Sequence, residues 1–241
     1  NSKNIKDLEV IWKYSSGKAY KNSPVQSSPI YTGTKVISIS PKSVFALDPV
    51  NGSLIWEVQW EDWVYSRGIT FSKEPIPKIF VPKATGNSES DSMRQGGGGV
   101  LEIDELSGKI LGYFDSGLTV VPPIIHDGKI IIATWMDGIK AYDLDSREQI
   151  WHLSLEKNGF QASVWSGFSF DVDTQLAYVV TGSYGGLMGW YRTEPNLQSS
   201  LIAFNVKTGE IEWIFQHIKH DLWDLDVVSN PIIFKLKKDN V

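Results

Sequence analysis

The stretch from His220 to Asp226, HDLWDLD, gathers groups that can do chemistry. It places Asp221, Asp224 and Asp226 within six residues of one another, beside a histidine and a tryptophan. Carboxylates are common side chains for taking up a proton from a substrate and for binding hard cations. A plainer interpretation is that the acids cap turns and the tryptophan packs in a corner of the fold.

Strand-forming segments flank this stretch and recur along the chain. The residues before it, 201–215, and after it, 230–234, are rich in Ile, Phe and other strand formers. Similar short runs, bounded by Gly, Asp, Asn, Ser and Pro, occupy most of the sequence, and no segment keeps a helical apolar period. The sequence therefore predicts an all-β protein.

Four segments repeat one pattern: residues 44–56, 100–114, 139–151 and 201–213. Each has an apolar strand, an Asp or Asn, a turn that usually carries glycine, and a second strand that closes on an aromatic residue. This pattern indicates a β-hairpin, because Asp and Asn start turns through side-chain hydrogen bonds and glycine supplies positive φ. The closing aromatics, expected in equivalent slots between neighbouring sheets, are Trp56, Phe114, Trp151 and Trp213.

Two further strands lie between successive hairpins, so each repeat has four strands. Radial repetition of four-stranded antiparallel sheets is a β-propeller. We expect about four blades in a single partial domain over residues 1–241.

The composition excludes several classes of function. The chain has 241 residues and a net charge of −5, and no basic patch marks a nucleic-acid surface. It has no cysteine, which excludes disulfides, thiolate metal sites and thiol nucleophiles. No apolar run approaches the ~18 residues of a membrane span. The polar N-terminus is not a signal peptide. We expect no nucleic-acid partner and no membrane span, and an export signal would lie outside this sequence.

Several motifs together resemble one family. NIKDLEVIWKYSSG at 4–17, SRGITF at 66–71, VWSGFSFDVDTQLAYVVTGS at 164–183 and FQHIKHDLWDLDV at 215–227 follow one another in the order found in quinoprotein dehydrogenases. The chain is therefore similar to the N-terminal half of these eight-bladed propellers, which use pyrroloquinoline quinone (PQQ) and calcium. Single repeats are weak signals because other propellers share them, whereas HDLWDLD after a tryptophan-closed hairpin is specific.

The resemblance implies roles for particular residues. Asp224 would be the base that takes the hydroxyl proton while hydride leaves for the quinone. Arg67 would bind the edge of PQQ, Trp165 would form the floor under its rings, and Gln26 would lie near its edge. The alternatives are a surface arginine before a turn glycine, a tryptophan between blades and an ordinary strand-end glutamine. Asp221 and Asp226 are expected to be structural.

The chain departs from the family pattern near the cofactor and the metal. The adjacent cysteines that often precede the family's arginine are absent. Where the family has a glutamate ligand this chain has Met136 followed by Asp137, and where it has an asparagine this chain has Ser183. The candidate metal ligands are therefore Asp224, Ser183 and Asp137. Calcium prefers about six to eight oxygen ligands, so either calcium binds weakly or this branch builds its metal site differently.

Two functions stay open on the sequence alone. The first is part of a periplasmic PQQ-dependent dehydrogenase that oxidises a small alcohol or sugar. The second is a non-catalytic propeller that serves as a binding scaffold, like the assembly lipoproteins that share the repeat. The altered calcium positions favour the scaffold, whereas the three cofactor segments at their family positions favour the enzyme, which we adopt. The rest of the ring, or a second copy of the chain, is expected to complete the propeller.

Overall fold

The computed structural model describes residues 5–18, 26–60, 63–86, 97–183, 196–219, 221 and 223–235, and its main strands form four blades. Blade 1 contains β1 (Ile30–Tyr31), β2 (Val36–Ser40), β3 (Ser43–Leu47) and β4 (Leu54–Gln59). Blade 2 contains β5 (Trp63–Tyr65), β6 (Thr70–Ser72), β7 (Lys78–Gly86), β8 (Gly98–Asp104) and β9 (Ile110–Phe114). Blade 3 contains β10 (Ile124–His126), β11 (Lys129–Ala133), β12 (Ile139–Asp143) and β13 (Gln149–Leu153). Blade 4 contains β16 (Ser169–Asp171), β17 (Leu176–Val180), β19 (Ser200–Asn205) and β20 (Ile211–Gln216).

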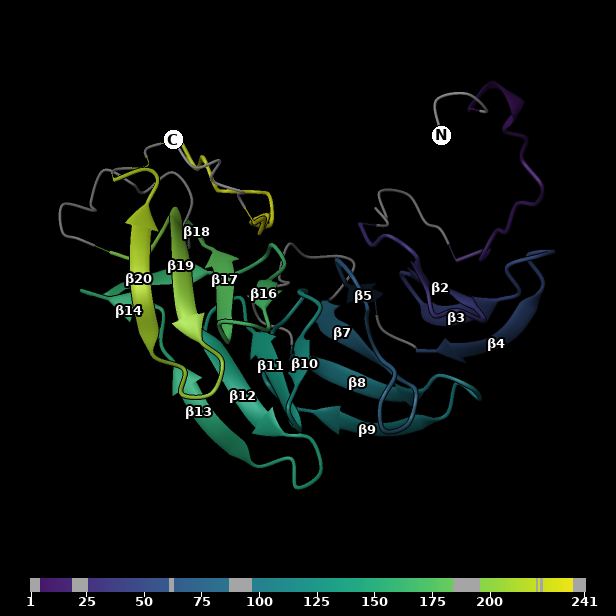
Figure 1. Cartoon of the computed structure of the whole chain (residues 1–241), viewed down its shortest axis with the longest axis horizontal. Helices are drawn as coiled ribbons and strands as arrows, with labels where there is room; N and C mark the ends of the chain where they lie inside the picture. Colours follow the sequence, from purple (N-terminus) through teal and green to yellow (C-terminus); the bar gives the residue numbers. More distant parts are fainter. Residues whose placement is uncertain are drawn as a thin grey trace.

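The blades stand side by side along an arc, from blade 1 at one end to blade 4 at the other (Figure 1). A small antiparallel sheet of β14 (Glu156–Lys157), β15 (Phe160–Ser163) and β18 (Gly182–Ser183) accompanies blade 4. In the described residues the helical structure is the short turn η1 (Ile5–Asp7), and no helix there is long and apolar enough to cross a membrane. The predicted all-β propeller with four-stranded blades is confirmed.

The hydrophobic core is divided among the interfaces between blades. Successive side chains of a strand point to opposite faces of the sheet. In β7, Ile79 and Val81 therefore pack against blade 1, whereas Phe80 packs against blade 3. In β11, Ile130 faces blade 2 and Ile131 faces blade 4. Burial on both faces explains why the central strands are continuous apolar runs in the sequence.

The hairpin turns form as the sequence predicts. The first turn residue accepts a backbone N–H on its side-chain oxygen in all four hairpins, at 2.7 Å for Asp48, 2.7 Å for Asp104, 2.8 Å for Asp143 and 2.9 Å for Asn205. In three of these turns a glycine then adopts positive φ, at 72° for Gly52, 74° for Gly108 and 76° for Gly209. These glycines also leave room for the neighbouring blade.

A tryptophan from an earlier part of the chain lies on each glycine turn: Trp12 of the N-terminal segment on Gly52, and a tryptophan of the preceding blade on Gly108 and on Gly209. Trp56 of blade 1 donates its indole N–H to the carbonyl of Glu105 in blade 2 at 3.0 Å. Its ring occupies the space of a Cβ at Gly108, only 2.7 Å away. Trp151 of blade 3 lies in the same way on Gly209 of blade 4. The predicted closing aromatics at these two positions therefore join neighbouring blades, and we call this contact tryptophan docking.

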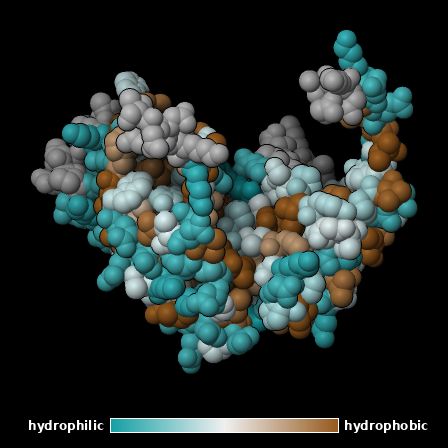
Figure 2. Space-filling view, in the orientation of Figure 1, coloured by the Kyte–Doolittle hydropathy of each residue, from teal (hydrophilic) through white to brown (hydrophobic). Residues whose placement is uncertain are grey.

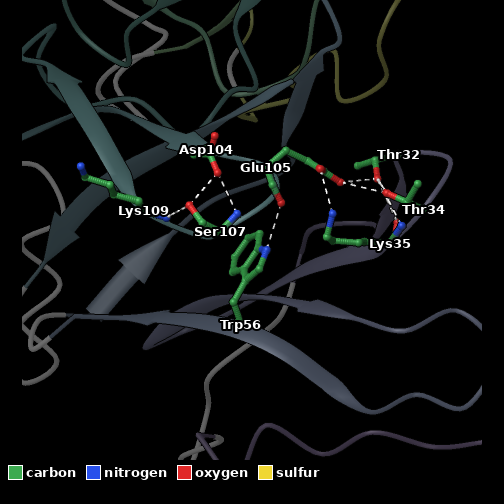
Figure 3. A network of polar contacts seen from close by, with 8 residues as sticks. All are labelled: Thr32, Thr34, Lys35, Trp56, Asp104, Glu105, Ser107 and Lys109. Atoms are coloured by element: carbon green, nitrogen blue, oxygen red, sulfur yellow. Dashed lines mark hydrogen bonds and ion pairs between the residues drawn. The ribbon is translucent and has the colours of Figure 1, made fainter. Parts of the chain in front are cut away.

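Polar contacts reinforce the junction of blades 1 and 2, as Figure 3 shows. The buried Glu105 carboxylate accepts hydrogen bonds from Lys35 Nζ at 2.9 Å and from the Thr32 hydroxyl at 2.6 Å. Both partners belong to the β1–β2 turn region of blade 1, while the Glu105 carbonyl accepts the Trp56 indole. One turn residue of blade 2 is thus held to two separate parts of blade 1.

The junction between blades 2 and 3 is built differently. In the other three hairpins the docking tryptophan lies opposite an alanine, in the pairs Ala46–Trp56, Ala141–Trp151 and Ala203–Trp213. The corresponding pair in blade 2 is Glu102 and Gly112. Phe114, the closing aromatic expected from the sequence, lies beyond this position at the end of β9. Blade 2 therefore has no side chain at the docking position.

Arg147 of blade 3 fills this position from the opposite side. It replaces the turn glycine and adopts its left-handed conformation, with φ of 62°. Its guanidinium lies where a Cβ on Gly112 would be, hydrogen bonds to Glu102 at 2.6 Å and stacks 4.7 Å from the Phe114 ring. Lys78 binds the other oxygen of Glu102 at 2.7 Å. An ionic contact thus replaces tryptophan docking at this junction. Compared with the other hairpins, three positions differ together: Glu102, Gly112 and Arg147.

Apolar side chains are exposed at both ends of the arc. In the N-terminal segment, residues 5–18, Trp12 docks on blade 1 through the Pro49 carbonyl at 3.0 Å, but Val10 and Ile11 are 73% and 78% exposed. At the other end, Trp213 is 43% exposed although it holds a docking position. Figure 2 shows hydrophobic surface along the N-terminal segment and an open hollow between the two ends. The described residues do not close the ring.

Candidate functional site

The loop that carries Arg67 connects β5 and β6 and is fixed against the segment before β10. The backbone N–H of Arg67 donates to the Val120 carbonyl at 2.8 Å. Gly68 lies so close to Pro122 that a Cβ would come within 2.9 Å of the proline ring. These contacts direct the arginine side chain away from its own blade, toward the segment that precedes blade 4.

Arg67 reaches Trp165, which follows β15. Its Cζ lies 4.4 Å from the centre of the indole ring, and Nη1 donates to the Trp165 carbonyl at 3.1 Å. A planar cation over an indole is held by attraction to the ring's negative face. Burial lowers the pKa of the Arg67 guanidinium, because desolvation disfavours the charged form. No ion pair within the described residues involves Arg67, so its charge is available to an anionic ligand.

Asp226 connects Trp165 to a third segment. One carboxylate oxygen accepts the Trp165 indole N–H at 2.8 Å, and the other accepts the Ser183 backbone N–H at 2.7 Å. Burial raises the pKa of the Asp226 carboxyl; these two hydrogen bonds oppose the rise, and the charges of Asp224 and Asp221 add to it. The partly buried Asp226 carboxylate is thus held beside the carboxylates of Asp224 and Asp221.

The three aspartates of the opening stretch form one group. Carboxylate oxygens of Asp221, Asp224 and Asp226 all lie within 4.8 Å of one another. Asp221 is buried, and its oxygens accept the Trp223 backbone N–H at 3.0 Å and the Ser199 hydroxyl at 3.3 Å. The structural role expected for Asp221 stays a prediction. Trp223 itself is 74% exposed, so it does not pack in the corner as the plainer interpretation requires.

Asp224 differs from its neighbours in conformation and exposure. Its side chain is exposed, and its backbone adopts φ of 59°, in the left-handed region. Asn and Asp tolerate this region better than most residues because their short polar side chains can hydrogen-bond locally. Asp224 is therefore the member of the group that a ligand can reach most directly.

The segment after Asp226 lies along the segment after Trp165 and borders a cavity. The Ser166 hydroxyl donates to the Val228 carbonyl at 3.2 Å, and the Gly167 N–H donates to the Asn230 side-chain oxygen at 2.6 Å. The cavity has a volume of about 180 Å³, and its walls include Arg67, Pro122, Trp165, Gly167, Val228 and Asn230. Complete small-molecule sites usually measure ~300–1,000 Å³, so this cavity is by itself smaller than a typical small-molecule site.

The other predicted residues lie in different surroundings. Gln26 is exposed in the segment that leads to β1. Asp137 is exposed in the turn between β11 and β12, where it pairs with Lys140 at 2.5 Å and His152 at 3.3 Å, and it is not part of the aspartate group. Ser183 adjoins that group through its backbone. Cofactor and metal roles for these residues stay predictions.

Two residues at this site were not singled out from the sequence as contacts of the tryptophan segment. Asp226 binds Trp165, and Asn230 binds Gly167. For Asp226 the sequence offered no signal, since Trp165 is 61 residues away. For Asn230 the sequence offered none, since its partner is 63 residues away.

Comparisons with known proteins show the family to which the chain belongs. Residues 1–117 and 139–241 match the family model described as glucose/ethanol/alcohol dehydrogenase, beta-propeller domain. The chain is 23% identical over 291 residues to the glycerol dehydrogenase large subunit of Gluconobacter thailandicus, an alignment that covers 97% of this chain and 38% of that protein.

Solved structures show the same fold. The quinohemoprotein alcohol dehydrogenase from Comamonas testosteroni matches with a TM-score of 0.77 at 20% identity, covering 95% of this chain and 40% of that one. A europium-containing methanol dehydrogenase matches with a TM-score of 0.74 at 18% identity, covering 95% and 47%. The chain thus spans less than half the length of each of these three proteins. The family model covers most of the chain, and we conclude that the chain belongs to the PQQ dehydrogenase β-propeller family.

Proposed function

We propose that this chain supplies about half of the propeller of a periplasmic PQQ-dependent dehydrogenase that oxidises a small alcohol or sugar. One observation carries the proposal: segments far apart in the sequence meet at a single place. Arg67 stacks on Trp165, Trp165 binds Asp226, and Asp226 lies in the same carboxylate group as Asp224. The remaining blades and the substrate pocket would come from the rest of the protein or from a second copy.

The residues around Trp165 fit a flat, anionic cofactor. The indole face already carries one flat group, the guanidinium of Arg67, at 4.4 Å. PQQ stacked on this face would require Arg67 to move toward the edge of the ring, where its planar donors suit a carboxylate or carbonyl of the cofactor. Gln26, exposed ahead of β1, is kept as a further contact at the cofactor's edge. When bound, PQQ would accept the hydride from the carbinol carbon.

Asp224 is proposed as the base. Its carboxylate would take the hydroxyl proton of the alcohol as the C–H bond breaks. The exposed side chain supports this role, because a substrate must reach it. Asp226 and Asp221 are each engaged in two hydrogen bonds within the protein and are poorer candidates.

The aspartate group suits a hard cation. Three carboxylates within 4.8 Å of one another repel, and a cation would relieve the repulsion while binding oxygen ligands of the type it prefers. We propose calcium or a lanthanide, with Asp224 and Asp226 as charged ligands and Ser183 beside them. The europium named for one similar structure supports a lanthanide. Asp137 could join only by giving up its contacts with Lys140 and His152.

Reconstitution of the whole protein tests this function. PQQ would be added with either calcium or a lanthanide, and dye-linked oxidation of a panel of alcohols and sugars would be measured. We expect turnover that requires both the quinone and a metal. Absence of turnover and of PQQ binding with every metal would instead support a non-catalytic scaffold.

Trp165→Ala is expected to weaken PQQ binding. The substitution removes the stacking surface, which contributes about 1 kcal/mol beyond its buried area, or roughly five-fold in affinity. Trp165→Phe keeps a flat ring and should retain most of the affinity. Titration of PQQ into the apoprotein would measure both, with Trp151→Phe, at the junction of blades 3 and 4, as control. Equal affinities in the parent and Trp165→Ala would show that Trp165 is not the floor.

A further inference from the structure

Asp226 holds together segments that are distant in the sequence. Its two carboxylate oxygens accept hydrogen bonds from Trp165, 61 residues away, and from the backbone of Ser183, 43 residues away. Both donors are N–H groups, so only a group with two acceptor oxygens satisfies them together. An asparagine at this position would place an amide N–H₂ against one of the two donors.

The backbone beside Asp226 is shaped for this carboxylate. Gly182 lies so close that a Cβ there would meet the Asp226 carboxylate carbon and both its oxygens at 2.7 Å. The Gly182 φ is not in the left-handed region, so the backbone conformation does not itself demand glycine. Space for the Asp226 carboxylate is therefore the physical reason for a glycine at this position.

The same carboxylate also belongs to the aspartate group that includes Asp224. A cation held by that group would lie one carboxylate and one hydrogen bond away from the Trp165 indole. Hydrogen-bond donors to metal-binding carboxylates fix their orientation and raise metal affinity, typically ~10–100-fold. Trp165 is such a donor to Asp226.

We propose that Asp226, itself one of the cation-binding carboxylates, couples the tryptophan floor to the cation, with Trp165 as the positioning residue. Through it, Trp165 supports cation binding, and the bound cation keeps the indole in one orientation. The inference rests on the proposed function for the identity of the cation site. It adds that the cation site and the Trp165 stacking surface are connected through the hydrogen bonds of Asp226, for which Gly182 leaves room.

Terbium(III) provides the test, because an excited indole close to the ion transfers energy to it and makes it luminesce. The apoprotein, without PQQ or substrate, would be titrated with Tb³⁺ under tryptophan excitation. The parent is expected to give sensitised emission. Because Trp223 also lies beside these aspartates, the titration would be made in a Trp223→Phe background. There Trp165→Phe should lose most of this emission, and Trp151→Phe, whose indole binds the Val206 carbonyl, should keep it.

The affinity for Tb³⁺ shows whether Trp165 supports cation binding or merely lies close to the bound ion. Measured by competition with a chelator, Tb³⁺ affinity should fall roughly 10-fold in Trp165→Phe, which removes the hydrogen bond but no ligand. Gly182→Ala also removes no ligand and should lower the affinity by displacing the carboxylate. Asp226→Asn should lower it further.

The proposal is overturned if the parent shows no sensitised emission, or if Trp165→Phe and Gly182→Ala bind Tb³⁺ as tightly as the parent. Circular dichroism would confirm that each variant keeps its strands. Since the assay needs neither quinone nor alcohol, a protein that passes it and still oxidises nothing retains the coupling and loses the proposed enzyme function.

Discussion

Asp224→Asn is expected to lower the turnover of the reconstituted enzyme roughly 10²- to 10⁴-fold, the usual effect of removing a general base. This corresponds to about 3–5 kcal/mol of transition-state stabilisation. The amide keeps the shape of the side chain but cannot take the hydroxyl proton. Turnover would be measured by dye-linked oxidation at saturating PQQ and metal, so that any loss of a cation ligand is offset by concentration.

The backbone makes asparagine the appropriate replacement. Asp224 has φ of 59°, which asparagine adopts more readily than alanine, so the fold should be unaffected. Asp173→Asn is a matched control, because this exposed aspartate pairs with Lys235 on the surface at 2.7 Å and such pairs contribute little. Unchanged turnover in Asp224→Asn would exclude it as the base. Equal losses in both variants would indicate a nonspecific effect of charge.

Glu102→Ala is expected to lower the free energy of unfolding by about 3 kcal/mol. Glu102 is 2% exposed and binds both Arg147 and Lys78, so its removal leaves two cations without their partner. Breaking a buried ion pair from one side typically costs ~3–5 kcal/mol. The lower value applies here because the Arg147 and Lys78 side chains are 35% and 23% exposed, so water can still solvate their charges when Glu102 is removed. Denaturant unfolding of the protein would measure the change.

A triple variant tests whether the ionic contact replaces tryptophan docking. Glu102→Ala, Gly112→Trp and Arg147→Gly together reproduce the residues of the other hairpins. If the positions are physically linked, the triple variant should regain most of the stability that Glu102→Ala loses. Gly112→Trp alone should destabilise, because Arg147 occupies the space. Additive losses across the three substitutions would show that the positions act independently.

The sequence was sufficient for the fold because its signals are local. Asp48, Asp104, Asp143 and Asn205 start their turns through bonds to residues two or three positions away. The alternation of strands and turns therefore predicted the blades. The exchange at Gly112 and Arg147 was not predictable in this way, because the two residues belong to different blades and each departs from its own hairpin pattern without indicating the other.

The candidate site was predictable only in part for the same reason. Motifs pointed to Arg67, Trp165 and Asp224, and the structure brings their segments together. It could not be read from the sequence that Asp226 connects them, since both of its hydrogen bonds span more than 40 residues. The stacking of Arg67 over the indole could not be predicted either, because the loop that carries Arg67 is held by a contact with Val120, which is distant in the sequence.

The ionic junction between blades 2 and 3 limits how such repeats can be recombined. A blade with a docking tryptophan can precede any blade that offers a glycine turn, so these units are interchangeable modules at that contact. Blade 2 offers Gly112 and requires an arginine, and blade 3 offers Arg147 and requires the glycine and glutamate. If the blades of this propeller were recombined with others, blades 2 and 3 would therefore have to be transferred together.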